Sequence, residues 1–279
     1  MTAVAGSLTD AAPQGASASR ARGRRPVTEW RVTRVVAPLV AVGVLFGLWE
    51  LAGLFVSTSL ISSPQQVAVD FVDQFISGPA VPALELSLRE LYIGIGIGVS
   101  AGIVLGLAIG RYRLLDAVLS PYINAANATP LNVLIPLLLV WVGIGTEARI
   151  LFIILISFFP VLLNTAGGLR NVSKGYVEVG KMLGLNEHQL MRKVILPASM
   201  PYIFAGVRVG VALGVIGMIV GEIEVSNVGI GYFINLYGNG FRTGQLLALI
   251  FLAALIGVAN VLVIRGVQAR WFRWISAAR

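Results

Sequence analysis

The sequence contains no cysteine, a single histidine and few charged side chains. Charged residues make up 12% of its 279 residues, about half of the roughly 25% that soluble domains carry. The lack of cysteine excludes disulfides, thiol chemistry and cysteine-ligated metals. Hydrophobic side chains make up 57% of the chain, which excludes disorder and exceeds what one water-soluble core of this size could bury. The composition therefore indicates an integral membrane protein.

Six apolar runs are long enough to cross a bilayer, which takes roughly 20 residues of helix. They predict an all-α polytopic membrane protein with six transmembrane helices. The expected spans lie near Val35–Val56, Leu84–Gly110, Asp116–Val142, Ile150–Leu169, Pro201–Ile223 and Gly244–Val267.

The Lys and Arg residues fall mostly on one side of these spans. They gather in the two terminal segments and in the connections that follow the second and fourth spans, whereas the opposite side receives Arg149 and Arg242. This positive-inside pattern predicts that both termini are cytoplasmic. The net charge of +8 is thus explained by topology, and no nucleic-acid partner is expected.

Two segments outside the spans have a recognisable character. Residues 1–33 are basic and, over most of their length, rich in Ala, Ser and Gly; we expect a disordered cytoplasmic tail there, although a transit peptide has a similar composition. Residues 34–279 are expected to form the transmembrane domain. Within it, Pro64–Ile76 carries apolar residues at four-residue spacing and predicts an interfacial helix on the outer side. That helix would either receive an extracytoplasmic partner or lie on lipid headgroups.

Glycines recur every fourth residue in two of the spans. Close backbone contact joins helices in lipid, so these stripes predict tightly crossed helices, within the chain or across a dimer. The glycines are Gly94, Gly98, Gly102, Gly106 and Gly110 in the second span, and Gly206, Gly210, Gly214, Gly217 and Gly221 in the fifth.

Ionisable residues inside spans cost about 2.5–3.5 kcal/mol on insertion scales and usually face protein or water. Glu85 and Arg89 have the order that favours a local i, i+4 ion pair. Arg208 could neutralise Glu222 or an anionic solute. The ionisable candidates are Glu50, Glu85, Arg89, Glu90, Arg208 and Glu222.

A group of polar residues interrupts the third span just before Pro130. Such a break either lines a cavity or serves hydrogen bonding between helices. The candidate substrate-pathway residues are Asn124, Asn127 and Thr129 from this break, together with Arg208 and Glu222.

The longest cytoplasmic connection, about residues 170–198, predicts two short helices with a sharp turn between them. The first, about Ser173–Leu183, ends at Gly184, which suits a left-handed C-cap position. Asn186 and Gln189 have the spacing of a capping box, with Leu185 and Leu190 at hydrophobic-staple positions. We expect the second helix to stop before Pro197.

The tip of this connection combines apolar and charged side chains. Met182, Leu183 and Leu185 lie among basic residues and Glu178. We interpret the connection as a rigid knob that binds a cytoplasmic partner.

The same connection resembles a known signature. Glu178-Val179-Gly180, Gly184 and Val194-Ile195-Leu196-Pro197 match, in spacing, the cytoplasmic motif of permease subunits of bacterial ABC importers, usually Glu-Ala-Ala, then Gly, then Ile-x-Leu-Pro. Val179 and Gly180 replace the two alanines, and Val194 replaces the isoleucine. Further stretches are similar to the nitrate/sulfonate/taurine branch: Ser87-Leu88-Arg89, Pro130–Gly145, Pro201–Arg208 and Gly229-Ile230-Gly231-Tyr232.

The resemblance implies a bacterial plasma-membrane permease that works by alternating access. Separate ABC ATPase subunits would drive it, an extracytoplasmic solute-binding protein would deliver the solute, and a second permease copy would complete a homodimer. The solute would be a small anion of the nitrate/sulfonate/taurine type or a vitamin precursor. The residues implied to contact the ATPase are Glu178, Gly180, Met182, Leu183, Gly184, Leu185, Asn186, Leu196 and Pro197.

Three other functions are less well supported by the residues. Gly175–Met182 matches a phosphate-binding loop at all but one position, but Met182 stands where a hydroxyl must hold magnesium, and no apolar strand precedes it. We therefore expect no cofactor in this chain, with ATP and magnesium bound by the ATPase. No catalytic constellation is apparent, so we do not expect an enzyme. A secondary transporter driven by an ion gradient is the remaining alternative, although no internal repeat is visible.

Overall fold

The computed structural model describes residues 27–57 and 60–271, and every regular element in those ranges is helical. The described chain divides into two units, one ending at Leu48 and one beginning at Trp49. Helix α1 (Val27–Phe55) forms the described part of the first unit, continues into the second from Trp49, and carries the apolar span Val36–Phe55. It begins within the predicted tail, and residues 1–26 of that tail lie outside the described ranges.

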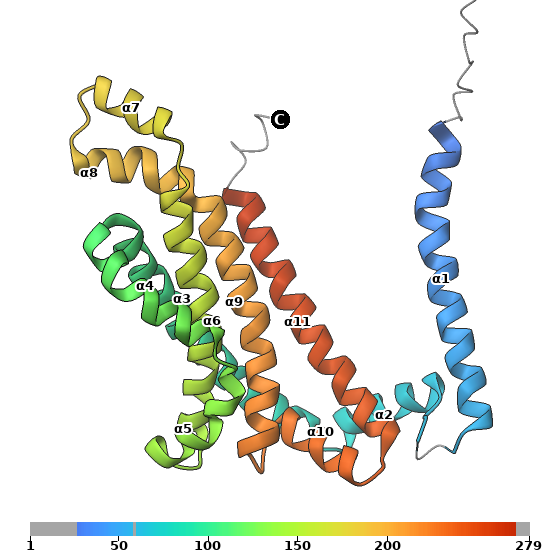
Figure 1. Cartoon of the computed structure of the whole chain (residues 1–279). Helices are drawn as coiled ribbons and strands as arrows, with labels where there is room; N and C mark the ends of the chain where they lie inside the picture. Colours follow the sequence, from blue (N-terminus) through green and yellow to red (C-terminus); the bar gives the residue numbers. More distant parts are fainter. Residues whose placement is uncertain (1–26, 58–59, 272–279) are drawn as a thin grey trace, which may run out of the picture. The chain divides into compact units, whose positions relative to one another are not determined.

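The second unit is a helical bundle with shorter helices at both ends (Figure 1). Its elements are α2 (Pro64–Ile76), α3 (Ala80–Arg111), α4 (Arg113–Ala128), the 3-10 helix η1 (Leu131–Leu134), α5 (Ile135–Val142), α6 (Thr146–Arg170), α7 (Lys174–Met182), α8 (Glu187–Leu190), the π-helix η2 (Met191–Ile195), α9 (Leu196–Val225), α10 (Ile230–Asn239) and α11 (Thr243–Trp271).

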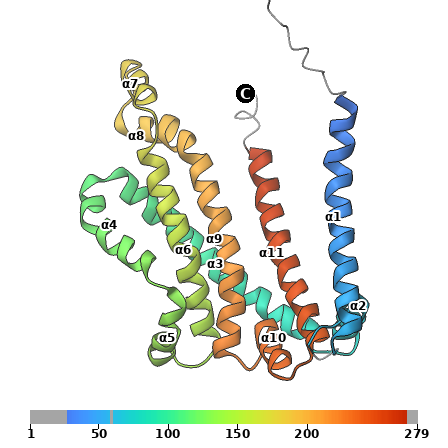
Figure 2. The same cartoon turned by 45° about the vertical axis from the view of Figure 1, so that its right-hand side comes forward.

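The span prediction is confirmed, with one span broken. Five described helices are long and apolar enough to cross a membrane, and the number is six when α4 with η1 and α5, bent by 91°, is counted as one span. The bend falls at Thr129–Pro130, where the sequence predicts an interruption. Thr129 is extended, with φ −78° and ψ 130°, as a residue before proline prefers. Figure 2 shows α4 and α5 as separate helices on either side of this bend.

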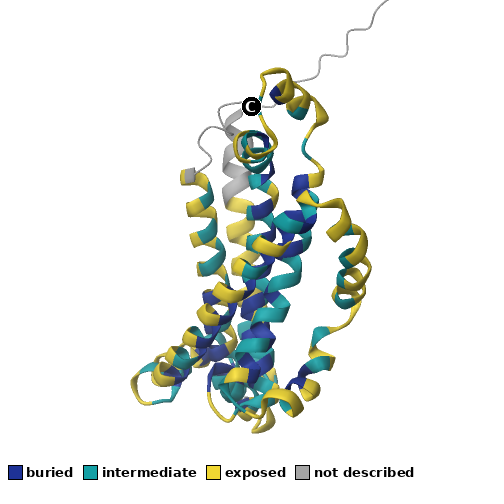
Figure 3. Cartoon of the chain, turned by 90° about the vertical axis from the view of Figure 1, so that its left-hand side faces the viewer, coloured by how far each residue is buried: buried dark blue, intermediate teal, exposed yellow. Residues whose placement is uncertain are grey.

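Helix α6 forms the centre of the bundle, between α3 and α9. The glycine stripes lie at these two contacts. A Cβ on Gly98 of α3 would lie 2.7 Å from the Ile154 carbonyl oxygen, and one on Gly210 of α9 would lie 2.7 Å from the Ser157 carbonyl oxygen. Backbones therefore approach closely on both sides of α6, which confirms the prediction of tightly crossed helices within the chain. The buried residues follow the middle of the bundle (Figure 3).

Helix α2 has the predicted bounds, but its apolar stripe contacts protein. Val67 is buried, and Phe71 and Phe75 pack against the core cluster that contains residues of α3, α9, α10 and α11. The apolar stripe is therefore covered by protein, which excludes the alternative in which it lies on lipid headgroups. The other faces of α2 are not covered by this contact.

The second helix of the knob does not stop before Pro197, and this prediction was wrong. Residues 187–225 form one continuous helical segment. Residues Met191–Ile195 adopt a π-helical turn, and the Leu196 N–H donates to the Met191 carbonyl. Because proline has no N–H to give and clashes with the preceding turn of an α-helix, a wider turn upstream accommodates it without ending the helix.

Candidate functional site

The knob, residues 173–195, projects from the end of the bundle at which α11 also ends (Figure 1). Helix α7 closes on Gly184, which has φ +75°. The Gly184 N–H donates to the Lys181 carbonyl at 3.0 Å, and the Leu185 N–H donates to the Gly180 carbonyl at 3.1 Å. These two bonds make a Schellman motif, in which the left-handed residue is normally glycine. The predicted C-cap is therefore present.

Helix α8 begins with the predicted capping box. The Asn186 side chain accepts from the Gln189 N–H at 2.9 Å, and the Gln189 side chain accepts from the Asn186 N–H at 3.1 Å. Because both helix ends that face the turn are satisfied by the turn's own residues, the turn needs no partner to hold its shape.

The inside of the knob is closely packed around Gly180. A Cβ on this buried glycine would lie 2.6 Å from Leu190 Cδ1 and 3.5 Å from both Leu185 Cδ1 and Val194 Cγ2. Glycine at this position thus lets α7 lie directly against the segment 185–194. The departure from the usual alanine of the signature has a packing explanation.

The outside of the knob is apolar at its tip. Met182 is 86% exposed and Leu183 is 75% exposed, and Glu178 is exposed on the same helix. The capped turn thus presents two large apolar side chains to the surroundings, an arrangement that is common at interaction surfaces. Leu196 and Pro197, which also belong to the signature, lie at the start of α9 and are half-buried.

Two connections tie the knob to the bundle. The helical segment 187–225 carries α8 directly into the fifth span. Arg111 at the end of α3 forms an ion pair with Glu187 at the start of α8, with Nη2 and Oε2 at 2.7 Å. The knob is therefore continuous with α9 and contacts α3 through this exposed ion pair.

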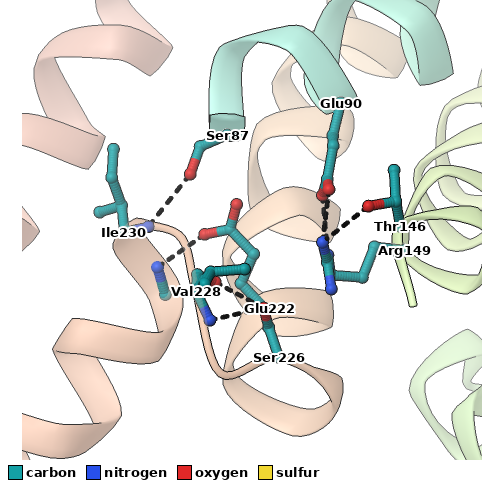
Figure 4. Close-up of polar contacts among 9 residues, drawn as sticks. Ser87, Glu90, Thr146, Arg149, Glu222, Ser226, Val228 and Ile230 are labelled. Carbon is teal, nitrogen blue, oxygen red and sulfur yellow. Dashed lines mark hydrogen bonds and ion pairs between the residues drawn. The ribbon is translucent and has the colours of Figure 1, made fainter. Parts of the chain in front are cut away.

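A buried polar cluster lies at the opposite end of the bundle (Figure 4). Arg149 of α6 binds both carboxylate oxygens of Glu90 on α3, at 2.8 and 2.5 Å, and also donates to Thr146 Oγ1 at 3.2 Å. Glu222 of α9 accepts from the Gly231 N–H at 2.7 Å. The Ile230 N–H donates to Ser87 Oγ at 3.0 Å. The cluster therefore fixes the first turn of α10 to α3 and α9.

The predicted ion pairs of the spans are not formed. In the part of the chain that the structure describes, Glu85 and Arg89 make no ion pair, and both side chains are exposed. Arg208 donates to Gln268 of α11 and does not approach Glu222. Since fourteen residues of one helix separate them by about 21 Å, these two could not meet within α9.

The candidate pathway residues occupy different places. Asn127 and Thr129 lie together in a cleft of about 360 Å³ between the break in the third span and helices α6 and α9. Asn124 is exposed on α4 and lies outside this cleft. Arg208 and Glu222 also lie elsewhere, at the α11 contact and in the polar cluster. Sequence reasoning missed Asn132 of the cleft and Arg149 of the cluster.

The fold of this bundle is that of ABC transporter permeases. It matches a chain of the solved structure titled "Crystal structure of an amino acid ABC transporter with histidines", with a TM-score of 0.54, 21% identity, and coverage of 74% of this chain and 96% of that one. It also matches the inward-facing MetNI methionine ABC transporter with a TM-score of 0.50 and 23% identity, over 67% of this chain and 99% of that one. The fold class is thus an all-helical polytopic membrane protein.

The family follows from the sequence match. The family described as "Binding-protein-dependent transport system inner membrane component" matches residues 98–276, and the chain belongs to it. It is thus the permease component of an ABC importer in the inner membrane and not the ATPase subunit. Systems of this family work with an ATPase and a binding protein, so nucleotide binding belongs to the partner.

The names of the relatives refer to different solutes. A protein of Escherichia coli K12 named SsuC, an aliphatic sulfonates transport permease by its name, is 34% identical over 90% of this chain and 96% of its own length. The taurine transport system permease protein TauC of the same strain is 28% identical, over 90% and 94%. The formylaminopyrimidine transport permease protein ThiX of Halalkalibacterium halodurans is 26% identical, over 88% and 98%.

Proposed function

We propose that this permease imports a small solute by alternating access, with the knob as the contact for the ATPase. The observation that carries this proposal is the knob itself, which has a capped turn, an apolar exposed tip and helical continuity into α9. A lever that transmits force must be stiff, and the caps supply this stiffness. The contact residues are those of the signature: Glu178, Gly180, Met182–Asn186, Leu196 and Pro197.

The mechanism is a shift between two packings of the bundle. ATP-driven approach of two ATPases would push the knobs of two permease copies toward each other. Each knob would carry its α9 with it and change the openings of a path between the two copies, with the two packings as the discrete states. The pathway candidates Asn127 and Thr129 support a path beside the break in the third span.

The solute belongs to the range that the relatives' names cover, which includes sulfonates, taurine, nitrate and a formylaminopyrimidine. A small organic or inorganic anion and a vitamin precursor both fit this range. An extracytoplasmic binding protein would select the solute and deliver it to the outer side, near α2 and α10.

Reconstitution separates this proposal from an ion-gradient transporter. The chain would be placed in vesicles alone, and then together with the ATPase and binding protein encoded beside it. Uptake of the solute that the binding protein carries is expected only in the second preparation, and only with ATP on the side of the membrane where the knob lies. Uptake by the chain alone under a proton or sodium gradient would overturn the proposal.

A further inference from the structure

The cleft at the break of the third span has a distinct chemical character. The break contributes three polar side chains, Asn127, Thr129 and Asn132, and α6 contributes Phe152 and Phe159. Its volume of about 360 Å³ lies within the range of small-molecule sites, roughly 300–1,000 Å³. The three polar side chains are exposed in the chain by itself. The cleft is therefore a hollow with amide and hydroxyl groups at the break and a wall of aromatic and aliphatic carbon from α6 and α9.

The cleft lies at the depth of the membrane. The α6 residues that line it extend to Phe159 and Pro160, near the middle of Thr146–Arg170. Exposed amides at this depth are unfavourable against hydrocarbon and are tolerated where they line water or contact protein. The polar side of the cleft is taken to line the solute path between two permease copies. In this respect the inference rests on the proposed function.

The described lining of the cleft offers no cation to an anionic solute, since it contains no charged side chain. A neighbouring hollow shares Asn132 and Val220 with it and adds the exposed carboxylate of Glu224. Neither Arg149, which is paired with Glu90, nor Arg208, which donates to Gln268 of α11, lines the cleft. With no cation in its lining and a carboxylate in the adjoining hollow, the cleft suits a neutral or cationic solute better than an anion.

The hydrogen-bonding groups also favour one class of compound. The Asn127 and Asn132 amides can each donate and accept. The Thr129 hydroxyl donates to the Ala125 carbonyl at 3.0 Å, so its oxygen remains an acceptor. Phe159 offers an apolar ring surface on which a flat ring can stack.

From this combination we propose that the cleft is a solute-contact site for a planar nitrogen heterocycle with amino or amide groups, neutral or cationic. Among the solutes that the relatives' names include, it would favour an aminopyrimidine over a sulfonate or nitrate.

The natural absence of cysteine permits a direct test. Asn132→Cys would be introduced into the complete chain, expressed with its ATPase, and labelled in permeabilised membranes with two methanethiosulfonates, one bearing a trimethylammonium group and the other a sulfonate. Asn239→Cys, at an exposed position of α10, is the control for intrinsic reactivity. The same measurements would be repeated with Glu224→Gln in both backgrounds.

We expect the cationic reagent to label the Asn132→Cys variant faster than the anionic one by at least about threefold, relative to the control, as a nearby unit charge in a partly aqueous hollow would cause. Glu224→Gln should remove this preference at position 132 and leave the control unchanged. Millimolar aminopyrimidine should slow the labelling of the Asn132→Cys variant, whereas taurine should not.

Each other outcome overturns the inference. Faster labelling by the anionic reagent, or protection by taurine alone, would show that the site is built for anions. Failure of both reagents to label the thiol at position 132 would show that the cleft does not face water. Because labelling needs neither ATP nor docking of the ATPase, failure of the proposed coupling would be detected separately, by loss of ATPase co-purification.

Discussion

Arg149 and Glu90 form a two-pronged ion pair between α6 and α3, with both side chains at most 5% exposed. They lie at the outer end of the same contact that the glycine stripe of α3 forms along α6. The pair therefore fixes the orientation of two helices that are already in close backbone contact. Ion pairs of this kind depend strongly on having both partners, because a single buried charge is costly.

Removal of one member of this pair should destabilise the protein strongly. We expect Arg149→Met to lower the free energy of unfolding by about 3–5 kcal/mol, since Glu90 is left buried and uncompensated. The double variant Glu90→Leu/Arg149→Met should be markedly more stable than Arg149→Met. Thermal unfolding of the purified complex in detergent measures both. Arg89→Met, at an exposed neighbour, is the control and should change little; a double variant as unstable as the single one would contradict this account.

Two glycines of α3 that are two residues apart should differ in how well they tolerate the same substitution. A Cβ on Gly98 would lie 2.7 Å from the Ile154 carbonyl oxygen and closer still to Ser157 Oγ, whereas nothing lies within 4 Å of one on Gly96. Gly98→Leu should therefore force α3 and α6 apart and reduce the folded protein recovered from membranes several-fold. Gly96→Leu should be tolerated. Size-exclusion profiles compare the two, and equal recoveries would show that the stripe is not a packing contact.

The turn of the knob should depend on the left-handed backbone at Gly184. Gly184→Val introduces a β-branched residue at φ +75°, at a strain cost of about 1–3 kcal/mol. We expect it to weaken ATPase co-purification by roughly 5- to 30-fold if one to two kcal/mol of this cost falls on docking. Gly184→Asn is the matched variant, because Asn tolerates this conformation. If Gly184→Val retains wild-type co-purification and ATP-coupled uptake, the knob is not the ATPase contact.

Glu178 should contribute to coupling through its charge. Since the side chain is exposed on α7, Glu178→Lys should leave folding and membrane insertion unchanged. We expect it to lower transport-coupled ATP hydrolysis several-fold. The hydrolysis rate of the reconstituted complex is compared with the amount of inserted permease, measured by immunoblot. Wild-type coupling in this variant would show that the carboxylate is incidental.

Local chemistry made the knob and the broken span predictable. The glycine at 184 and the pair Asn186 and Gln189 act on backbone groups within six residues, so their bonds are set by short-range geometry. Pro130 removes an N–H at a known place and biases the residue before it. The glycine stripes could be recognised for a similar reason, because their spacing matches the helix period.

The partners of the buried charges could not be predicted in the same way. The i, i+4 rule applies to neighbours on one helix, and it favoured Glu85 with Arg89. Which face of α3 is turned inward depends on the crossing with α6, and that crossing buries Glu90 instead. At Pro197 no signal in the sequence indicated the π-helical turn Met191–Ile195, which lets the helix continue through a proline that ordinary α-helical geometry would exclude.

The amino-acid sequence by itself determined the membrane class, the caps of the knob and the place at which the third span breaks, because these follow from hydrophobicity and from cap and proline chemistry along one stretch of chain. Only the tertiary structure decided which side chains meet across helices: Arg149 with Glu90, Glu222 with the first turn of α10, and the polar residues of the break with Phe152 and Phe159 of α6 around one cleft. These contacts join residues on different helices, and their geometry exists only once the backbones of α3, α6 and α9 have packed together.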